Sequence, residues 1–299
     1  MTADDRRRRA LAAAGLPTGG RFERVASYAN EVWIGQHMVV RVGHLGLPGG
    51  ELGRLGREAA IAARLPGEAR YPEILHVGRD DEMAWMITRR VPGTELARAW
   101  PALTSAEREQ ATRELAAALA AVHATPTDGI PDDIRPPHTL PLAPLLELCD
   151  EVPDAGLARA CAQFVRARWD AFDDADRGLV HGDPHLENVL WHAGHVTALL
   201  DFEWARPSWI HCDLEILLAV AADPKVFVAA DLEAHIHGDQ FVNVPRWLRA
   251  ECPHWFAHPR LAARLAVLEL SRTLGIFADD PISAASRLDD VRALLDSAA

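Results

Sequence analysis

Hydrophobic and polar positions alternate along the first third of the chain. From Arg21 to Gly43 the sequence reads RFERVASYANEVWIGQHMVVRVG, which is rich in β-branched residues and is interrupted at Gly35-Gln36. Alternation with a period of two predicts two or three strands joined by short turns. Residues 73–93 (EILHVGRDDEMAWMITRRVPG) read as a strand, an acidic turn and a second strand. This part of the chain is therefore expected to form mainly β-structure.

Two helical segments frame these strands. The first is expected to begin at Thr2 or Asp4 and to end at Gly15, since Thr and Asp are preferred at helix starts and glycine at helix ends. The second, LGRLGREAAIAARLPG, is expected to end at Pro66.

Helical patterns dominate after about Val91, which is the best position for a domain boundary. Thr104 and Glu107 form a capping box ahead of a helix that should run to about Ala124. Further helical patterns cover residues 142–149, 155–172, 213–222, 231–237 and 260–277. The predicted fold class is α+β, with a mainly β N-terminal lobe over residues 1–90 and a mainly helical C-terminal lobe over residues 91–299.

One short β-segment interrupts the helical part. Residues 189–191 and 196–200 are apolar runs on either side of a turn signal, Ala193-Gly194, and this order predicts a hairpin. The loop HGDPHLEN, residues 181–188, comes directly before the hairpin. Pairing of the two strands should bring Asn188, at the start of the hairpin, beside Asp201, at its end.

The three oxygen-bearing side chains of this region suggest a phosphoryl-transfer site. Mg²⁺ binds hard oxygen ligands and commonly uses one or two protein groups together with substrate phosphates, so Asn188 and Asp201 are the candidate metal ligands. Asp183, just ahead of them in the loop, is the candidate catalytic base, because a carboxylate can accept the proton of an attacking hydroxyl.

The motif His181-Gly182-Asp183-x4-Asn188, followed by Asp201-Phe202-Glu203, resembles the catalytic core of the aminoglycoside phosphotransferase family. That family is similar in fold to protein kinases, whose motifs are H-R-D-x4-N and D-F-G. The resemblance implies a protein-kinase-like two-lobe fold, with ATP (or GTP) and Mg²⁺ as cofactors. A second HGD, at residues 237–239, has no Asn at the matching distance and no DF motif after it. We expect that copy to lie on the surface without a catalytic role.

The resemblance extends into the first third of the chain. Arg41 in MVVRVG stands where the family has a phosphate-binding basic residue, and Glu58 is its expected partner. The usual Lys is absent, but Arg keeps the charge and binds phosphate through two donors. Backbone groups around Thr88 to Arg90 are expected to bind adenine. The turn that contains Ser27 resembles the loop that covers the nucleotide.

Several residues near the motif have weaker assignments. His185 and Glu203 are candidates for contacts with the acceptor substrate. His181, Asp213 and His123 are expected to be structural: His181 as a support for the catalytic loop, Asp213 as a helix cap and His123 as part of the core.

Charge favours a cationic small-molecule acceptor. The chain carries a net charge of −12, which opposes binding to nucleic acid. From Asp201 to the end there are 15 acidic and 9 basic residues. An acceptor site lined by this acidic part of the chain would attract an aminoglycoside or a basic peptide antibiotic. Apolar runs stay shorter than a membrane-spanning helix needs, and the start of the chain does not resemble a signal peptide, so a cytoplasmic location is expected.

Other functions are compatible with the same sequence. The fold could serve a metabolite kinase acting on a sugar, choline or homoserine, or a kinase-like binding protein without turnover. A nucleic-acid-binding arm at residues 6–9 is a further alternative. The sequence leaves the oligomeric state open.

Overall fold

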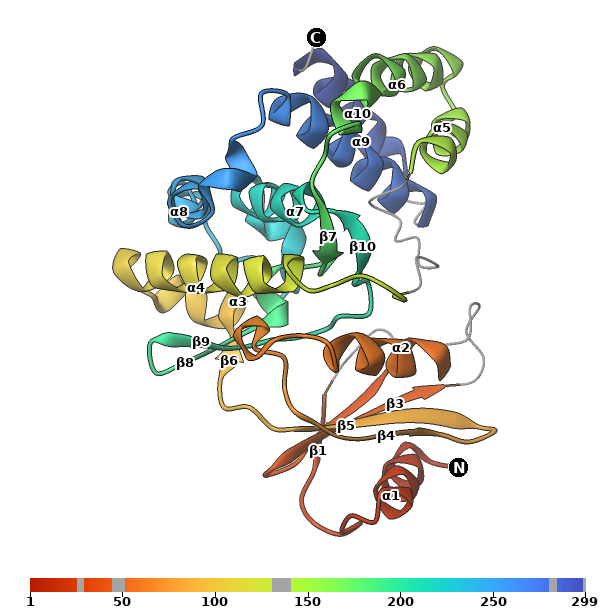
Figure 1. The fold of residues 1–299 in the computed structure, drawn as a ribbon, viewed down its shortest axis with the longest axis vertical. Helices are drawn as coiled ribbons and strands as arrows, with labels where there is room; N and C mark the ends of the chain where they lie inside the picture. Colours follow the sequence, from red (N-terminus) through yellow and green to blue (C-terminus); the bar gives the residue numbers. More distant parts are fainter. Residues whose placement is uncertain (26–29, 45–51, 131–140, 280–283, 298–299) are drawn as a thin grey trace.

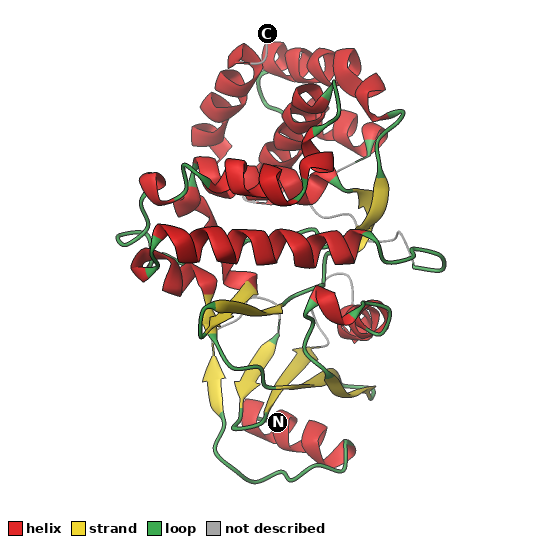
Figure 2. Cartoon of the chain, turned by 60° about the vertical axis from the view of Figure 1, so that its left-hand side comes forward, coloured by secondary structure: helices red, strands yellow, loops and turns green. Residues whose placement is uncertain are grey.

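The computed structural model describes residues 1–25, 30–44, 52–130, 141–279 and 284–297. A sheet with one helix on each face occupies the N-terminal end, and helices gather at the C-terminal end (Figures 1 and 2). Ser27, the candidate for the nucleotide-covering loop, lies outside the described residues.

The N-terminal sheet is antiparallel, with strand order β1-β2-β3-β5-β4. Its strands are β1 (Glu23–Val25), β2 (Glu31–Ile34), β3 (Met38–His44), β4 (Ile74–Arg79) and β5 (Met83–Arg89). The predicted strands, and the turn near Gly35, are therefore confirmed. Since β5 ends at Arg89 and the next strand pairs with the helical part, we keep residue 90 as the proposed lobe boundary.

The two faces of this sheet are covered by different helices, as Figure 1 shows. Helix α1 (Ala3–Ala13) packs on the face that carries Val40, Val42 and alternate residues of β5. Helix α2 (Leu52–Ala62) packs on the opposite face, where Leu55 and Ala59 meet Ala84 and Met86. Alternate residues of β5 thus contribute to two small cores, one on each face of the sheet. Arg41, between Val40 and Val42, points to the face that α2 covers.

The arginines of α1 are engaged in ion pairs. Arg6 pairs with the buried Glu31, Arg7 and Arg8 pair with Asp4, and Arg9 pairs with Asp80 and Glu82. A helix whose basic side chains already face carboxylates is a poor phosphate-binding arm. The arginines of residues 6–9 therefore already have carboxylate partners within the chain.

The C-terminal part is mainly helical. Its helices are α3 (Leu96–Ala99), α4 (Ser105–His123), α5 (Leu142–Asp150), α6 (Ala155–Arg168), α7 (His211–Ala222), α8 (Val244–Glu251), α9 (Leu261–Asp279) and α10 (Ala284–Ser297). The Thr104–Glu107 capping box is present at the start of α4, as predicted. None of the described helices is long and apolar enough to cross a membrane.

Two small sheets lie within the helical part. Strands β6 (Thr94–Glu95), β8 (Val189–His192) and β9 (His195–Leu199) form one in the order β6-β8-β9. Strands β7 (Arg177–Val180) and β10 (Arg206–Trp209) form the other. The predicted hairpin is β8–β9, and its turn residues Ala193 and Gly194 both have positive φ.

Two expectations for the region after Phe202 were wrong. Residues 206–209 form the strand β10, although helical structure is expected for the chain after Phe202; Pro207 weakens the strand signal but is tolerated in a two-stranded sheet. Residues 231–237 form turns and not a helix. Their backbone hydrogen bonds include bonds to the residue three positions earlier, such as Leu232 N–H to Ala229 O. Few residues precede Gly238, so the hydrogen bonds of a helix there would not offset the free-energy cost of helix nucleation.

Candidate active site

The β8–β9 hairpin places the two candidate metal ligands beside the paired ends of its strands, Asn188 just before β8 and Asp201 just after β9. Val189 pairs with Leu199, and the amide of Leu200 donates to the carbonyl of Asn188 over 2.8 Å. Asn188 ends the short 3₁₀ helix η4 (Leu186–Asn188), and Asp201 follows directly after Leu200. Their predicted proximity is therefore a consequence of the strand register.

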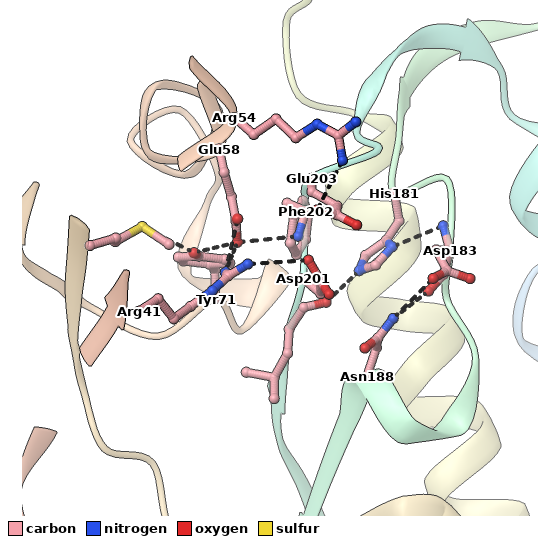
Figure 3. A network of polar contacts seen from close by, with 12 residues as sticks. Arg41, Arg54, Glu58, Tyr71, His181, Asp183, Asn188, Asp201, Phe202 and Glu203 are labelled. Atoms are coloured by element: carbon pink, nitrogen blue, oxygen red, sulfur yellow. Dashed lines mark hydrogen bonds and ion pairs between the residues drawn. The ribbon is translucent and has the colours of Figure 1, made fainter. Parts of the chain in front are cut away.

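Asp183 joins this group through hydrogen bonds of the loop 181–188 (Figure 3). Asn188 Nδ2 donates to the backbone carbonyl of Asp183 over 2.9 Å and lies 3.5 Å from Asp183 Oδ2. His185 Nε2 lies 3.3 Å from the same Oδ2 atom. The structure thus brings Asp183 and Asn188 together and turns His185 toward Asp183.

The buried carboxylate of Asp213 supports the loop 181–188. Asp213, fully buried near the start of α7, accepts hydrogen bonds from the amides of His181 and Gly182 over 2.9 and 2.8 Å. His123 Nε2 lies 2.8 Å from Asp213 Oδ2. Burial opposes ionisation of Asp213, but the contact with His123 and the loop amides hold its pKa below the ordinary value. Asp213 and His123 are therefore structural, as expected, although Asp213 anchors the loop and does not cap a helix.

The ring of His181 is also held at both nitrogens. Its Nδ1 accepts from the amide of Asp183 over 3.2 Å, so its Nε2 is the donor to the carbonyl of Leu200 at 2.8 Å. One imidazole therefore ties the loop that carries Asp183 to the strand that leads into Asp201. This confirms the structural role predicted for His181.

Arg41 forms the centre of a buried ionic network on the other side of Asp201. Its Nη1 lies 2.7 and 2.9 Å from the two carboxylate oxygens of Glu58, and its Nη2 lies 3.5 Å from Asp201 Oδ1. Burial would lower the pKa of Arg41, but Glu58 and Asp201 raise it above the usual value, so the guanidinium stays charged. The predicted Arg41–Glu58 pair is therefore present.

Glu58 makes two further contacts that fix it. Tyr71 Oη donates to Glu58 Oε1 over 2.9 Å, and the amide of Phe202 donates to the same oxygen over 3.3 Å. The rings of Tyr71 and Phe202 meet edge to face, with centroids 5.3 Å apart. Glu58 thus links α2 to the segment that carries Asp201.

Asp201 has the features expected of a cation ligand. Its backbone has φ 62°, a left-handed conformation that non-glycine residues seldom adopt. Its Oδ1 atom is buried and makes no hydrogen bond within the described part of the chain, and it is in contact with Arg41 only as an ion pair at 3.5 Å. Because the amide nitrogen of Asn188 points to Asp183, the Asn188 oxygen faces the opposite way, as Figure 3 shows. Two hard oxygen donors beside the paired strand ends fit Mg²⁺.

A cavity of about 320 Å³ opens beside these groups, between the N-terminal sheet and the β8–β9 hairpin. Arg41, Asn188 and Asp201 lie at its wall, together with Thr88 and Arg90. Its apolar lining comes from Val25, Val32, Ile34, Val39, Leu190 and Leu200. An apolar slot with charged groups at its edge suits a planar ring joined to a polar chain.

The segment that ends β5 has some of its backbone donors engaged. The amide of Arg89 donates to Glu73 O over 2.8 Å, and the amide of Arg90 donates to His37 O over 2.9 Å. The Arg90 side chain donates to Gly35 O over 3.0 Å. Arg90 therefore fastens the end of β5 to the β2–β3 turn.

Glu203 lies beside the same network, on the side of α2. Its carboxylate is 3.9 Å from Arg54, and its side chain is 15% exposed. Burial, together with the negative charge of Asp201, raises the pKa of Glu203 to about 7.

Sequence reasoning did not identify every residue of the site. Tyr71 and Arg54 were missed because no motif surrounds them. Their roles arise only when α2 packs against the segment after β9. The second HGD, residues 237–239, is exposed as expected.

A family model described as the phosphotransferase enzyme family matches residues 22–266, which include every element of this site. The chain belongs to that family. The resemblance to aminoglycoside phosphotransferases that the HGD and DFE motifs suggested is thus confirmed.

Curated relatives of this family member include two kinds of kinase. Homoserine kinase of Gluconobacter oxydans (strain 621H) is 37% identical over 122 residues, which cover 38% of this chain and 39% of the relative. Aminoglycoside 3'-phosphotransferase of Streptomyces fradiae is 38% identical over 167 residues, covering 51% of this chain and 60% of the relative. The matched stretches thus span less than two thirds of either relative.

Solved structures of family members share the fold over nearly the whole chain. A thermostable mutant of aminoglycoside phosphotransferase APH(4)-Ia, in ternary complex with ADP and hygromycin B, has a TM-score of 0.66 at 17% identity, covering 97% of this chain and 98% of that chain. The gentamicin–APH(2")-IIa complex has a TM-score of 0.65 at 11% identity, with 99% and 96% covered. These similarities confirm the kinase-like α+β fold.

Proposed function

We propose that this phosphotransferase moves the γ-phosphoryl group of ATP to a hydroxyl group of a small cationic molecule, with an aminoglycoside or a basic peptide antibiotic as the acceptor class. The observation that carries the proposal is that Asn188, Asp201 and Arg41 line one cavity, and that the Asn188 amide donates a hydrogen bond to Asp183. Family members of the same fold are known as complexes with ADP and hygromycin B and with gentamicin.

The nucleotide base would occupy the apolar part of the cavity. The amides of Arg89 and Arg90 already donate within the protein, so the carbonyl of Arg89 and the amide of Val91 are the proposed adenine partners. This choice sharpens the expectation for Thr88 to Arg90: Thr88 lines the cavity, and Arg90 holds the strand end in place. The guanine of GTP would have to bind to the same carbonyl of Arg89 and amide of Val91.

The triphosphate would extend toward Arg41. Glu58 and Asp201 fix the guanidinium, so its remaining N–H groups have a set direction toward phosphate oxygens. Asn188 and Asp201 would hold Mg²⁺, which when bound neutralises charge on the phosphate oxygens. The Arg41–Glu58 pair thus takes the place of the Lys–Glu pair of related kinases.

Asp183 would orient the acceptor hydroxyl and take its proton. The hydroxyl oxygen forms the new bond to the γ-phosphorus as the bond from phosphorus to the β,γ-bridging oxygen breaks, and ADP leaves. The protein contributes mainly by positioning and by charge, since this reaction needs little covalent chemistry from the enzyme. Glu203, beside Asp201, is the proposed carboxylate for an acceptor amine.

A second acceptor class is favoured by one specific finding. The relative with 37% identity over 122 residues is a homoserine kinase, so a small amino alcohol could replace the antibiotic. Both acceptor classes carry an ammonium group and a hydroxyl, and the same base would serve either.

The purified chain, with ATP and Mg²⁺, should be tested against hygromycin B, gentamicin, a basic peptide antibiotic, homoserine and choline. We expect one acceptor to gain a single phosphoryl group by mass spectrometry, and excess chelator to abolish the gain. Asp183→Asn serves as the control. If no acceptor is modified, or if this variant transfers phosphate as fast as the wild type, the proposed function is wrong.

A further inference from the structure

The catalytic loop holds one oxygen of the Asp183 carboxylate from two sides. Asp183 Oδ2 lies 3.3 Å from His185 Nε2 and 3.5 Å from Asn188 Nδ2. Asn188 Nδ2 also donates to the Asp183 carbonyl over 2.9 Å, so that amide is shared between two acceptors. His185 is therefore the closer of the two side chains at Oδ2.

The hydrogen bonds of His185 determine which ring nitrogen carries the proton. The amide of Glu187 donates to His185 Nδ1 over 3.3 Å, so Nδ1 is an acceptor. The proton of the neutral ring is then on Nε2, which lies 3.3 Å from Asp183 Oδ2 and also 3.3 Å from Asn188 Nδ2; because an amide nitrogen cannot accept it, the proton is directed to Asp183. The charged ring has a proton at the same atom, so the donor is present in either protonation state.

The position of His185 leaves its ring little freedom to do anything else. It precedes η4, whose first turn it caps through Nδ1, and its carbonyl accepts from the amide of Asn188 over 3.0 Å. Its side chain is only 18% exposed. To reach an acceptor substrate, the ring would have to give up both the Glu187 and the Asp183 contacts.

We propose that His185 is a positioning residue whose Nε2–H fixes the rotation of the Asp183 carboxylate, so that the carboxylate meets the acceptor hydroxyl in one orientation. The inference rests on the proposed function. It replaces the sequence-based expectation of a direct contact between His185 and the acceptor.

Loss of this donor should affect the chemical step and leave binding nearly unchanged. A misplacement of the base by about 1 Å can cost roughly 100-fold in rate, so His185→Leu is expected to lower kcat by about 10- to 100-fold. The KM values for ATP and for the acceptor should stay within about twofold, because an interaction used only in the transition state changes kcat. His185→Gln keeps an N–H donor and should recover part of the loss.

The test compares His185→Leu and His185→Gln with the wild type, using hygromycin B or gentamicin, whichever the wild type phosphorylates. His192→Leu, which removes an exposed histidine of β8, is the matched control and should keep wild-type kinetics. ATP affinity by calorimetry and the melting temperature show whether each variant is folded and binds nucleotide.

The outcomes separate this inference from the proposed function. If the wild type modifies neither antibiotic, the proposed aminoglycoside transfer fails by itself. If the wild type is active and Asp183→Asn is inactive, three results would overturn the role of His185: an unchanged kcat in His185→Leu, a rise confined to the acceptor KM, or no recovery in His185→Gln. A folded His185→Leu with low kcat, normal KM and partial recovery in His185→Gln supports it.

Discussion

Replacement of Gly182 by Ala should damage both stability and turnover, because two separate costs coincide at this position. Gly182 has φ +87°, a backbone conformation that side chains disfavour. A Cβ atom there would lie 2.7 Å from the carbonyl oxygen of Trp204 and 3.0 Å from Arg206 Nη1. Related protein kinases have Arg at this place in the motif, and this structure has no room for it.

Gly194 provides a matched control for the backbone cost. It has φ +86°, almost the same value, yet a Cβ atom there would have no heavy atom within 4 Å outside its chain neighbours. Ala in the left-handed region costs about 1–2 kcal/mol, part of which is offset by the stiffer unfolded chain. Gly194→Ala should therefore lower the free energy of unfolding by about 1 kcal/mol or less.

Gly182→Ala adds the clash with Trp204 to the same backbone cost. Overpacking of a filled site costs about 1–3 kcal/mol, so the total should be about 2–4 kcal/mol. At about 2–4 °C per kcal/mol, the melting temperature should fall by about 4–16 °C. The shift needed to relieve the clash would also displace the neighbouring Asp183, and kcat should drop at least about 10-fold.

Thermal unfolding and steady-state phosphoryl transfer of the two variants test this reasoning. We expect Gly182→Ala to be less stable than Gly194→Ala by at least about 1 kcal/mol and to lose activity, while Gly194→Ala keeps it. Equal stability of the two variants would show that the Trp204 contact carries no cost. Wild-type turnover in Gly182→Ala would show that loop position does not control Asp183.

Two further predictions concern buried carboxylates. Glu58→Ala leaves the Arg41 guanidinium with only its 3.5 Å ion pair to Asp201 and the Tyr71 hydroxyl without its carboxylate acceptor, and should cost about 3–5 kcal/mol in urea unfolding; a loss below about 1 kcal/mol would contradict this. Burial of Glu215, opposed by Arg272, raises the pKa of Glu215 to about 7, so the folded chain keeps a proton that the unfolded chain loses near pH 4.5. The free energy of unfolding should therefore fall by up to about 3 kcal/mol as pH rises from about 4.5 to 7, at 1.36 kcal/mol per pH unit. Glu215→Gln should flatten this slope, and an identical pH dependence in the variant would refute the assignment.

The motif of the active site could be predicted because its parts are close in sequence. Asn188 and Asp201 flank a hairpin with a recognisable turn, and strand pairing brings them together through local backbone hydrogen bonds. The loop that carries Asp183 leads directly into the same hairpin. The alternation of apolar residues in β3 and β5 likewise predicted strands in the first third of the chain.

Other features depended on contacts between distant segments. Glu58 and the Phe202 amide are 144 residues apart, and only the packing of α2 against the end of the hairpin brings them within hydrogen-bond distance. Residues 231–237 have a helical composition, but the core holds Leu232 and Ile236 in a turn.

The amino-acid sequence by itself determined the chemical groups of the catalytic loop, the hairpin that unites the two candidate metal ligands, and the family. Local hydrogen bonding and the period of the strands are enough for that. Only the tertiary structure decided that Arg41 is fixed between Glu58 and Asp201, that Tyr71 joins this network, and that His185 faces the base. The contacts of Asp201 and Tyr71 with the Arg41–Glu58 pair depend on the relative placement of segments far apart in the sequence, and the contact of His185 depends on the folded conformation of the loop 181–188.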